Sequence, residues 1–216
     1  MTGSPFLLKA GAKRWCGAAA ACALVFALHP AHAWILTITP GVKTIYLQVG
    51  TGSYTGGNYN AGGIPANNAT INLVSVTVPA PVIGTGAAQA MTSNSGTSTS
   101  FYDGFAICNP PAQVYVGGWA RLPVGSGTAV LTVTSPANLT SGGNTLPFSQ
   151  ISWTSTANGN PSPDIAAGTF NGGTVTLANI AAGTWVEDCH TFTYANTAIQ
   201  AAGTYTGRAT YSLSLP

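Results

Sequence analysis

The sequence predicts an all-β protein, an antiparallel β-sandwich of about nine or ten strands in a single domain. Three observations lead to this class. Apolar and polar residues alternate with a period of two, which is typical of half-buried strands, and no stretch sustains the period of a helix. The chain contains 27 Gly and 14 Pro, the residues that turn and end strands. Only 5% of the residues are charged, which is too few for a helical bundle or a coiled coil.

Residues 34–49 are expected to form one long N-terminal strand that bends at Pro40-Gly41. Its apolar side chains share one face, because successive side chains of a strand point to opposite sides. In the second half of the strand these side chains are Ile45, Leu47 and Val49. A loop rich in Gly, Tyr and Asn follows at residues 50–68.

The middle of the chain is expected to form four strands that are rich in β-branched and aromatic residues. They are Ile71–Val78, Phe101–Cys108, Gln113–Trp119 and Thr128–Thr134. The Gly- and Ser-rich stretch from Gly84 to Thr99 is predicted to be a long exposed loop. A split of the chain near Pro110-Pro111 into two smaller sandwiches is the alternative to a single domain.

The last third of the chain repeats the pattern Ala-Ala-Gly-Thr-aromatic three times, at residues 166–170, 181–185 and 201–205. The pattern predicts a turn in which Gly adopts a positive φ, followed by a strand that opens on Thr and an aromatic residue. Two long strands are expected here, Trp185–Tyr194 and Tyr205–Leu215, and the second alternates strictly between apolar and polar residues.

Residues 1–33 have the layout of a secretory signal peptide. Basic residues precede an apolar run of eleven, Ala18–Leu28, and a small-x-small cleavage site ends at Ala33. The run is shorter than the ~20 apolar residues of a membrane span. A buried N-terminal helix is the alternative. We therefore expect a mature protein of residues 34–216 that is secreted to the outside of the cell and does not span a membrane.

The mature chain is nearly neutral. It has three basic and four acidic residues, and 3 − 4 gives a formal charge of −1, against +2 for the whole chain. A protein that binds nucleic acid by counterion release needs a patch of Lys and Arg that this chain lacks. A surface with so few charges is poorly protected against self-association.

The mature chain has two cysteines, Cys108 and Cys189. In an oxidising compartment two thiols most simply form one disulfide, and closing a loop of this length stabilises the fold by about 4 kcal/mol. A nucleophilic or metal-binding Cys needs a partner His. The one His of the mature chain, His190, is adjacent to Cys189, so in a strand the two side chains point apart. We expect a structural disulfide.

Few residues are available for chemistry, and we expect no enzyme activity, catalytic residue, cofactor or bound metal. Acid–base and glycosidase chemistry needs two carboxylates placed together, whereas Glu187 and Asp188 are adjacent and face opposite ways in a strand. Asp188 and His190 would share a face. Either this carboxylate orients the imidazole or, as we expect, the two form an exposed polar pair beside a buried Cys189. Nucleophile-elbow and phosphate-binding glycine motifs are absent from the sequence.

Aromatic residues offer a second kind of function. Tyr54, Asn58 and Tyr59 in the Gly-rich loop have rings and an amide that can stack against a sugar and hydrogen-bond to it. A glycan is therefore one candidate ligand. The expected alternative is that the loop tyrosines pack back on the sandwich and the strand aromatics fill its core.

The C-terminal sequence AAGTYTGRATYSLSLP resembles the end of bacterial pilins of the chaperone–usher type, and spore-coat-U-like secreted proteins are similar. In that family a Gly stands fourteenth from the end and an alternating strand leads to a penultimate aromatic residue. Gly203 has that place here, whereas the penultimate residue is Leu215. The two mature cysteines also lie further apart and later than the pair common in such pilins. The resemblance covers the C-terminal strand and, loosely, the first mature strand.

The resemblance implies an immunoglobulin-like, pilin-like sandwich that lacks a strand, which the N-terminal strand of the next subunit supplies. It also implies self-association into a fimbrium or pilus fibre, with a periplasmic chaperone and an usher as assembly partners. The subunit contacts would be made by Leu36, Ile38, Ile45, Leu47 and Val49 of the donated strand and by Gly203, Tyr205, Tyr211, Leu213 and Leu215 of the groove.

We therefore expect a secreted, non-enzymatic structural or adhesive surface protein that is assembled by strand donation. In the alternative, both terminal segments belong to one complete monomeric sandwich, and the protein is a soluble carbohydrate-binding module.

Overall fold

The computed structural model describes residues 45–49, 72–121, 127–157 and 159–215, with only the backbone of residues 48 and 49. All of these residues belong to one compact unit, Ile38–Pro216. The predicted signal peptide, the first part of the N-terminal strand with Leu36 and Ile38, and the loop with Tyr54, Asn58 and Tyr59 lie outside the described residues.

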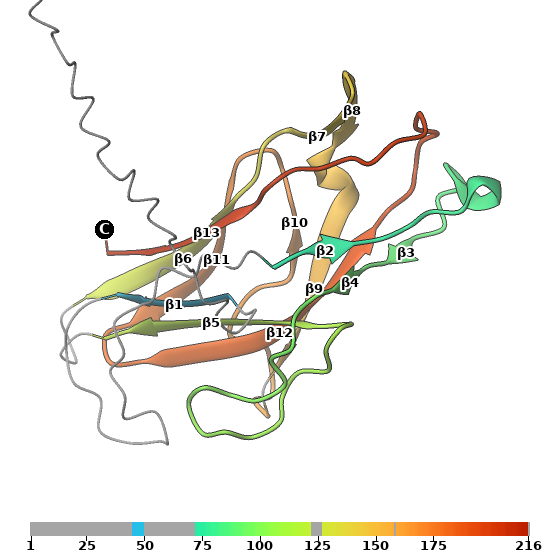
Figure 1. Ribbon diagram of the computed structural model, residues 1–216. Coiled ribbons are helices and arrows are strands. Elements are labelled where there is room, and N and C mark those ends of the chain that lie inside the picture. Colours follow the sequence, from blue (N-terminus) through green and yellow to red (C-terminus); the bar gives the residue numbers. More distant parts are fainter. Residues whose placement is uncertain (1–44, 50–71, 122–126, 158, 216) are drawn as a thin grey trace, which may run out of the picture. The chain divides into compact units, whose positions relative to one another are not determined.

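The fold is all-β and sandwich-like, as predicted (Figure 1). The larger sheet has the order β1-β5-β12-β9-β10, and β3 also pairs with β12. Its strands are β1 (Ile45–Val49), β3 (Gln89–Ala90), β5 (Val114–Ala120), β9 (Ile151–Ala157), β10 (Gly168–Thr169) and β12 (Trp185–Tyr194). The second sheet has the order β11-β6-β13. Its strands are β6 (Thr128–Thr134), β11 (Thr174–Ala181) and β13 (Thr210–Ser214).

Two short strand pairs and two turns of 3₁₀ helix complete the described fold. The first pair is β2 (Val74–Ser75) with β4 (Thr92–Ser93), and the second is the hairpin β7 (Asn138–Ser141) with β8 (Asn144–Pro147). The helical turns are η1 (Ala80–Val82) and η2 (Phe148–Gln150). The hairpin turns at Gly142 and Gly143, whose φ angles of 52° and 91° suit the type of turn that joins two antiparallel strands.

One strand pairing differs from the others. Within the described part of the chain, β1 and β5 run parallel, whereas the remaining strand pairs are antiparallel. Ile45 lies opposite Val116 and Val49 opposite Ala120. A tight turn cannot join parallel strands, and here residues 50–113 connect the two. In the order of the larger sheet β1 is the end strand, so among the described strands it forms an edge.

A single apolar core fills the space between the sheets. Its centre is formed by side chains that are almost completely buried, among them Val114, Val116, Leu131, Val133, Ile165 and Ile180. Ile45 and Leu47 pack against this core from β1, and Tyr211 and Leu213 pack against it from β13. The predicted common face of Ile45 and Leu47 is thus turned to the interior.

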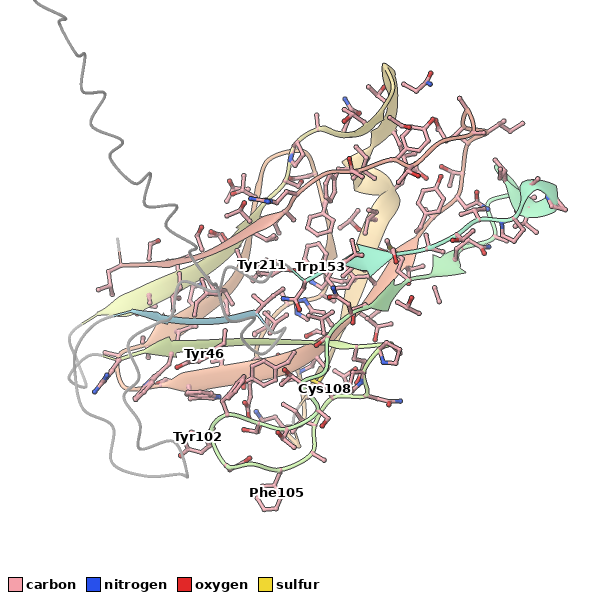
Figure 2. All side chains as sticks on the ribbon, in the orientation of Figure 1. Tyr46, Tyr102, Phe105, Cys108, Trp153 and Tyr211 are labelled. Atoms are coloured by element: carbon pink, nitrogen blue, oxygen red, sulfur yellow. A yellow bond between two sulfur atoms is a disulfide. The ribbon has the colours of Figure 1, made fainter. Side chains whose placement is uncertain are left out.

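The outer face of the larger sheet is covered by residues 94–112 rather than by another sheet (Figure 2). The Cys108–Cys189 disulfide fastens this segment to β12, with Cα atoms 5.5 Å apart, and confirms the predicted pairing. Tyr115, Tyr46 and Phe101 pack around the two cysteines. At the tip of the segment Phe105 points away from the sheet and is 71% exposed.

Several predicted elements are confirmed, and others are wrong. The strands expected at Gln113–Trp119, Thr128–Thr134 and Trp185–Tyr194 correspond to β5, β6 and β12. Residues 101–108 do not form a strand, because the segment turns back on itself. The N–H of Gly104 donates to the carbonyl of Ser100, whose own N–H donates to the carbonyl of Phe105.

The stretch Gly84–Thr99 is not a wholly exposed loop. It contains β3 and β4, and Met91, Ser95 and Thr97 are buried in it. The stretch pairs with β12 through Gln89 and Ala90, and the N–H of Met91 donates to the carbonyl of Phe192.

The predicted strands Ile71–Val78 and Tyr205–Leu215 are shorter than expected, since only Val74–Ser75 and Thr210–Ser214 pair as strands. The alternation of exposure extends along residues 72–79, whereas in the C-terminal segment it holds only for residues 208–214, because Gly207 and Leu215 are exposed. Of the three repeated Gly turns, only Gly183 has the expected positive φ, 75°. At Gly168 the reason for glycine is space, because a Cβ there would lie 2.8 Å from the indole of Trp153.

Candidate functional site

The first candidate site is the edge of the sandwich where β1 and β13 meet. β1 is the end strand of the larger sheet, β13 is the end strand of the second sheet, and the two strands contact each other. Ile45 and Leu47 on one side and Tyr211 and Leu213 on the other are half-buried against the same core. These four are predicted contact residues that the structure brings together.

The remaining predicted contact residues lie further along the C-terminal segment or are described only in part. Tyr205 is half-buried, and its hydroxyl donates to the carbonyl of Ala201 over 2.9 Å. Leu215 is 41% exposed. Gly203 is exposed, and a Cβ there would lie 2.5 Å from Oγ of Ser141. For Val49 only the pairing of its backbone with Ala120 is described.

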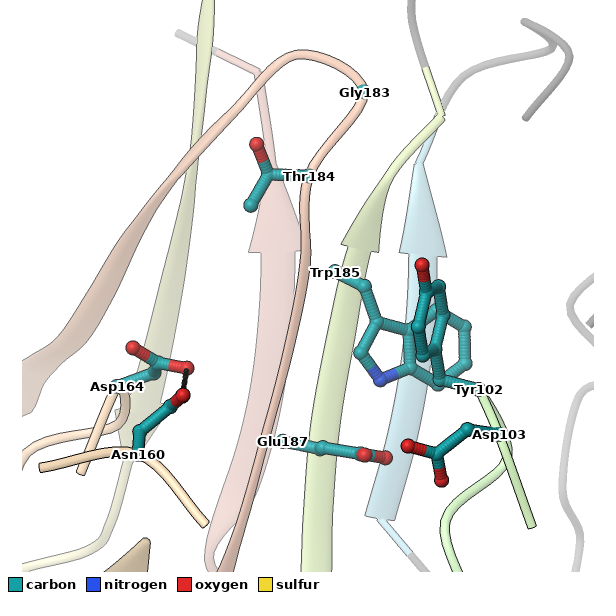
Figure 3. A pocket seen from close by; sticks show the side chains of 8 residues that line it. All are labelled: Tyr102, Asp103, Asn160, Asp164, Gly183, Thr184, Trp185 and Glu187. Atoms are coloured by element: carbon teal, nitrogen blue, oxygen red, sulfur yellow. Dashed lines mark hydrogen bonds between the residues drawn. The ribbon is translucent and has the colours of Figure 1, made fainter. Parts of the chain in front are cut away.

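The second candidate site is a pocket on the outer face, with a volume of about 370 Å³ (Figure 3). Four segments far apart in the sequence form its walls. They contribute Tyr102 and Asp103 from the covering segment, Asn160 and Asp164 from the connection after β9, Gly183 and Thr184 from the β11–β12 turn, and Trp185 and Glu187 from β12. The pocket thus combines two aromatic rings with carboxylate, amide and hydroxyl groups.

Hydrogen bonds of Ser100 hold the covering segment in place beside the pocket. Its Oγ accepts from the backbone N–H groups of Tyr102 at 2.9 Å and Asp103 at 3.2 Å. The same hydroxyl donates to Oε1 of Glu187 over 2.5 Å. Together with the disulfide at Cys108, these bonds fix Tyr102 and Asp103 relative to β12.

Glu187 is the buried carboxylate of the pocket, only 5% exposed. Its Oε2 accepts a hydrogen bond of 2.6 Å from the hydroxyl of Tyr115. Burial, and then the negative charge of Glu187, raise the pKa of Tyr115, so the phenol keeps its proton and remains a donor. Burial of the carboxylate is therefore compensated by charge-assisted hydrogen bonds.

The opposite wall is held by Asp188, which points to the other face of β12. Its Oδ2 accepts from the buried N–H of Ile165 over 2.5 Å. Next to this anchor, Nδ2 of Asn160 donates to Oδ2 of Asp164 over 2.9 Å, and both of these residues are exposed (Figure 3). Two adjacent carboxylates of β12 therefore position two separate walls of the pocket.

An aromatic cluster connects the pocket to the β1 edge. The ring of Trp185 stacks on Tyr46 of β1, with centroids 5.1 Å apart and planes at 25°. Tyr102 lies 5.7 Å and Trp119 5.8 Å from the same ring. The guanidinium of Arg121 lies 5.5 Å from the ring of Trp119, within the range of a cation–π contact. The strand β1 thus supports the aromatic wall of the pocket.

The predicted exposed pair of Asp188 and His190 is wrong, because both side chains are completely buried on the inner face of β12. His190 packs against Trp153, with ring centroids 6.0 Å apart, and neither of its nitrogens forms a hydrogen bond. Burial lowers the pKa of His190 to about 3 and raises that of Asp188 to about 6. The carboxylate does not orient the imidazole, so the pair does not form a catalytic dyad.

Sequence reasoning missed the gathering of Asp103, Asp164 and Glu187, three of the four acidic residues of the chain. The only signal in the sequence that could have indicated this group was the small number of acidic residues in a nearly uncharged chain. Across the described ranges no group of three or more His, Cys, Asp or Glu side chains is placed to hold a metal ion. The same ranges contain no helix with the length and apolarity that a membrane crossing requires.

Comparison with known proteins finds no matching family, no matching curated protein and no matching solved structure.

Proposed function

We propose that this chain is a secreted, non-enzymatic structural or adhesive surface protein that assembles into a fibre by donating its N-terminal strand. The observation that carries the proposal is the position of β1. It is a five-residue edge strand, parallel to β5, and its side chains Ile45 and Leu47 pack against the core.

A strand held in this way can come from its own chain or from a second copy. Residues 50–113 separate β1 from β5, so no tight turn enforces the pairing. The backbone pairs and apolar contacts are the same whichever chain supplies the strand. If each subunit gives its strand to the next, the contact is head-to-tail and builds an open filament.

The energy available to such a contact is large enough for assembly. Burying each apolar side chain contributes roughly 1.5–3 kcal/mol, and β1 adds backbone pairs along Val116–Ala120. The position that β1 occupies is also bordered by Tyr211 and Leu213 of β13. The resemblance of the segment from Gly203 to Leu215 to chaperone–usher pilins supports a periplasmic chaperone, an usher and a final place in a fimbrium or on the cell surface.

In the alternative, a soluble carbohydrate-binding module, β1 stays in its own sandwich. Three proteins distinguish the two functions: residues 34–216, residues 50–216, and residues 50–216 with residues 34–49 appended after Pro216 through a flexible linker. Strand donation predicts oligomers for the first, a less stable monomer for the second and a stable, closed monomer for the third. Size-exclusion chromatography with thermal melting measures all three.

A peptide experiment tests the register of the donated strand. Residues 50–216 are expected to bind a peptide of residues 34–49 and to melt at a higher temperature with it. A peptide with Leu47→Asp should not bind, because that side chain faces the core, whereas the matched peptide with Tyr46→Phe should bind. If residues 34–216 elute as a monomer that melts cooperatively, and residues 50–216 are unfolded, the fibre proposal fails and the binding module takes its place.

A further inference from the structure

We propose that the pocket between Tyr102 and Trp185 binds a neutral saccharide unit. This inference goes beyond the proposed assembly. It requires that β1 is paired with β5, but it does not depend on which chain supplies β1. It places the ligand on residues 102–103, 160–164 and 183–187 rather than on the tyrosine loop that the sequence suggested.

The size of the pocket suits a small sugar. Its volume of about 370 Å³ lies near the lower end of the ~300–1,000 Å³ range of small-molecule sites. The close-up shows the ring of Trp185 beside Tyr102, with Glu187 below these rings and with Asn160 and Asp164 on the opposite side of the pocket (Figure 3). A mono- or disaccharide fits such a space.

The chemistry of the walls matches the two sides of a sugar ring. A pyranose has an apolar face of C–H groups, which packs on aromatic rings such as those of Trp185 and Tyr102. Its hydroxyl groups both donate and accept hydrogen bonds. Asp103 and Asp164 accept, the amide of Asn160 donates and accepts, and the hydroxyl of Thr184 does both.

Ligands of other charge fit less well. The lining residues include three carboxylates and neither Lys nor Arg, so a phosphate or an acidic sugar would be repelled. An ammonium group would be attracted, but it has only donors and would use the carboxylates alone, not the donors of Asn160 and Thr184. A neutral ligand rich in hydroxyl groups can bond to both the hydrogen-bond acceptors and the hydrogen-bond donors of the pocket walls.

The walls are positioned before any ligand arrives, which lowers the entropic cost of binding. Ser100 and the disulfide at Cys108 hold one wall, and Asp188 holds the segment of the other through Ile165. Tyr46 of β1 supports Trp185 from behind. The pocket is therefore complete only when β1 occupies its place.

The test is calorimetric titration of residues 34–216 with methyl glycosides of glucose, galactose, mannose and N-acetylglucosamine and with their disaccharides. At least one is expected to bind. Asn160→Ala and Trp185→Ala should each weaken binding about tenfold or more, the loss of one good contact. The matched control is Asn179→Ala, an exposed Asn on β11, which should leave affinity unchanged. Because Asn160 is exposed, its variant tests the site even if Trp185→Ala impairs folding.

The outcomes separate this inference from the fibre proposal. Titration is scored per subunit, whatever the oligomeric state, so binding by a monomer supports the pocket while overturning fibre assembly. Assembly without binding of any glycoside overturns the pocket alone. Sugar binding that survives in both pocket variants also overturns the saccharide proposal. So does salt-sensitive binding of the diamine cadaverine when none of the sugars binds.

Discussion

The hydroxyl of Tyr115 donates a 2.6 Å hydrogen bond to Glu187, and both side chains are buried beneath the segment that covers the outer face of the sandwich. Glu187 also accepts from Ser100, so this carboxylate joins β5, β12 and the covering segment. Asp188, the next residue, anchors Ile165 on the opposite side of the strand. In a chain with four acidic residues after Ala33, two adjacent ones thus serve as internal anchors.

Tyr115→Phe is expected to lower the free energy of unfolding by about 1.5–3 kcal/mol, because it removes a donor from a buried carboxylate. Urea denaturation measures the change. The matched control is Tyr211→Phe, since the Tyr211 hydroxyl is buried and forms no hydrogen bond; its removal should leave stability unchanged or slightly higher. Equal losses in the two variants would contradict the anchoring role of Glu187.

The pH dependence of stability is expected to reflect two opposing titrations. The pKa of Asp188 rises from 3.8 to about 6 through burial, with Asp164 and Glu187 adding to the rise. This contribution to stability is fully present below pH 3.8 and is lost as the pH rises through 6. The pKa of His190 falls from 6.5 to about 3 through burial, so stability is lost as the pH falls from 6.5 toward 3.

Between pH 4 and 6 the two effects nearly cancel in the native protein, and single variants should reveal each one. With Asp188→Asn, stability should fall by about 1.4 kcal/mol per unit as the pH is lowered from 6 to 4. With His190→Leu, it should rise by a similar amount over the same range. Denaturation at a series of pH values measures both slopes. Flat profiles for both variants would show that the two groups do not titrate as their burial requires.

Reduction of the Cys108–Cys189 disulfide is expected to destabilise the fold by about 4 kcal/mol, since the bond closes a loop of about 80 residues. Thiol titration of denatured residues 34–216 should find no free cysteine until a reductant is added. Two titratable thiols in the untreated protein would contradict this. Reduction should also weaken saccharide binding, because Tyr102 and Asp103 would lose an anchor.

Gly168→Ala is expected to cost about 1–3 kcal/mol through overpacking. Its Cβ would lie 2.8 Å from the indole of Trp153, whose Nε1 donates to the carbonyl of Ala166 over 2.9 Å. Gly96→Ala is the matched control, because open space surrounds that position and its φ is not left-handed. Thermal melting compares the two. If they melt alike, the close approach to Trp153 does not require glycine.

Part of the fold could be predicted because it depends on local pattern. The β-branched run at Thr128–Thr134 predicted β6, and the Gly-Thr-aromatic pattern predicted that a strand opens at Trp185, where β12 begins. Ile45 and Leu47 were correctly assigned to one face, since the side chains of a strand alternate whatever lies around them. The pairing of Cys108 with Cys189 followed from counting the thiols of the predicted mature chain, residues 34–216.

The tertiary structure alone decided which faces are covered. Alternation predicts that Asp188 and His190 share a face, but not that this face is the interior, and burial of that face is what shifts both pKa values. Residues 101–108 were predicted to be a strand, but in the structure they belong to the covering segment and place Tyr102 and Asp103 in the wall of the pocket. Asp103, Asp164 and Glu187 meet there because chain folding brings distant segments together, and no local sequence pattern records such long-range contacts.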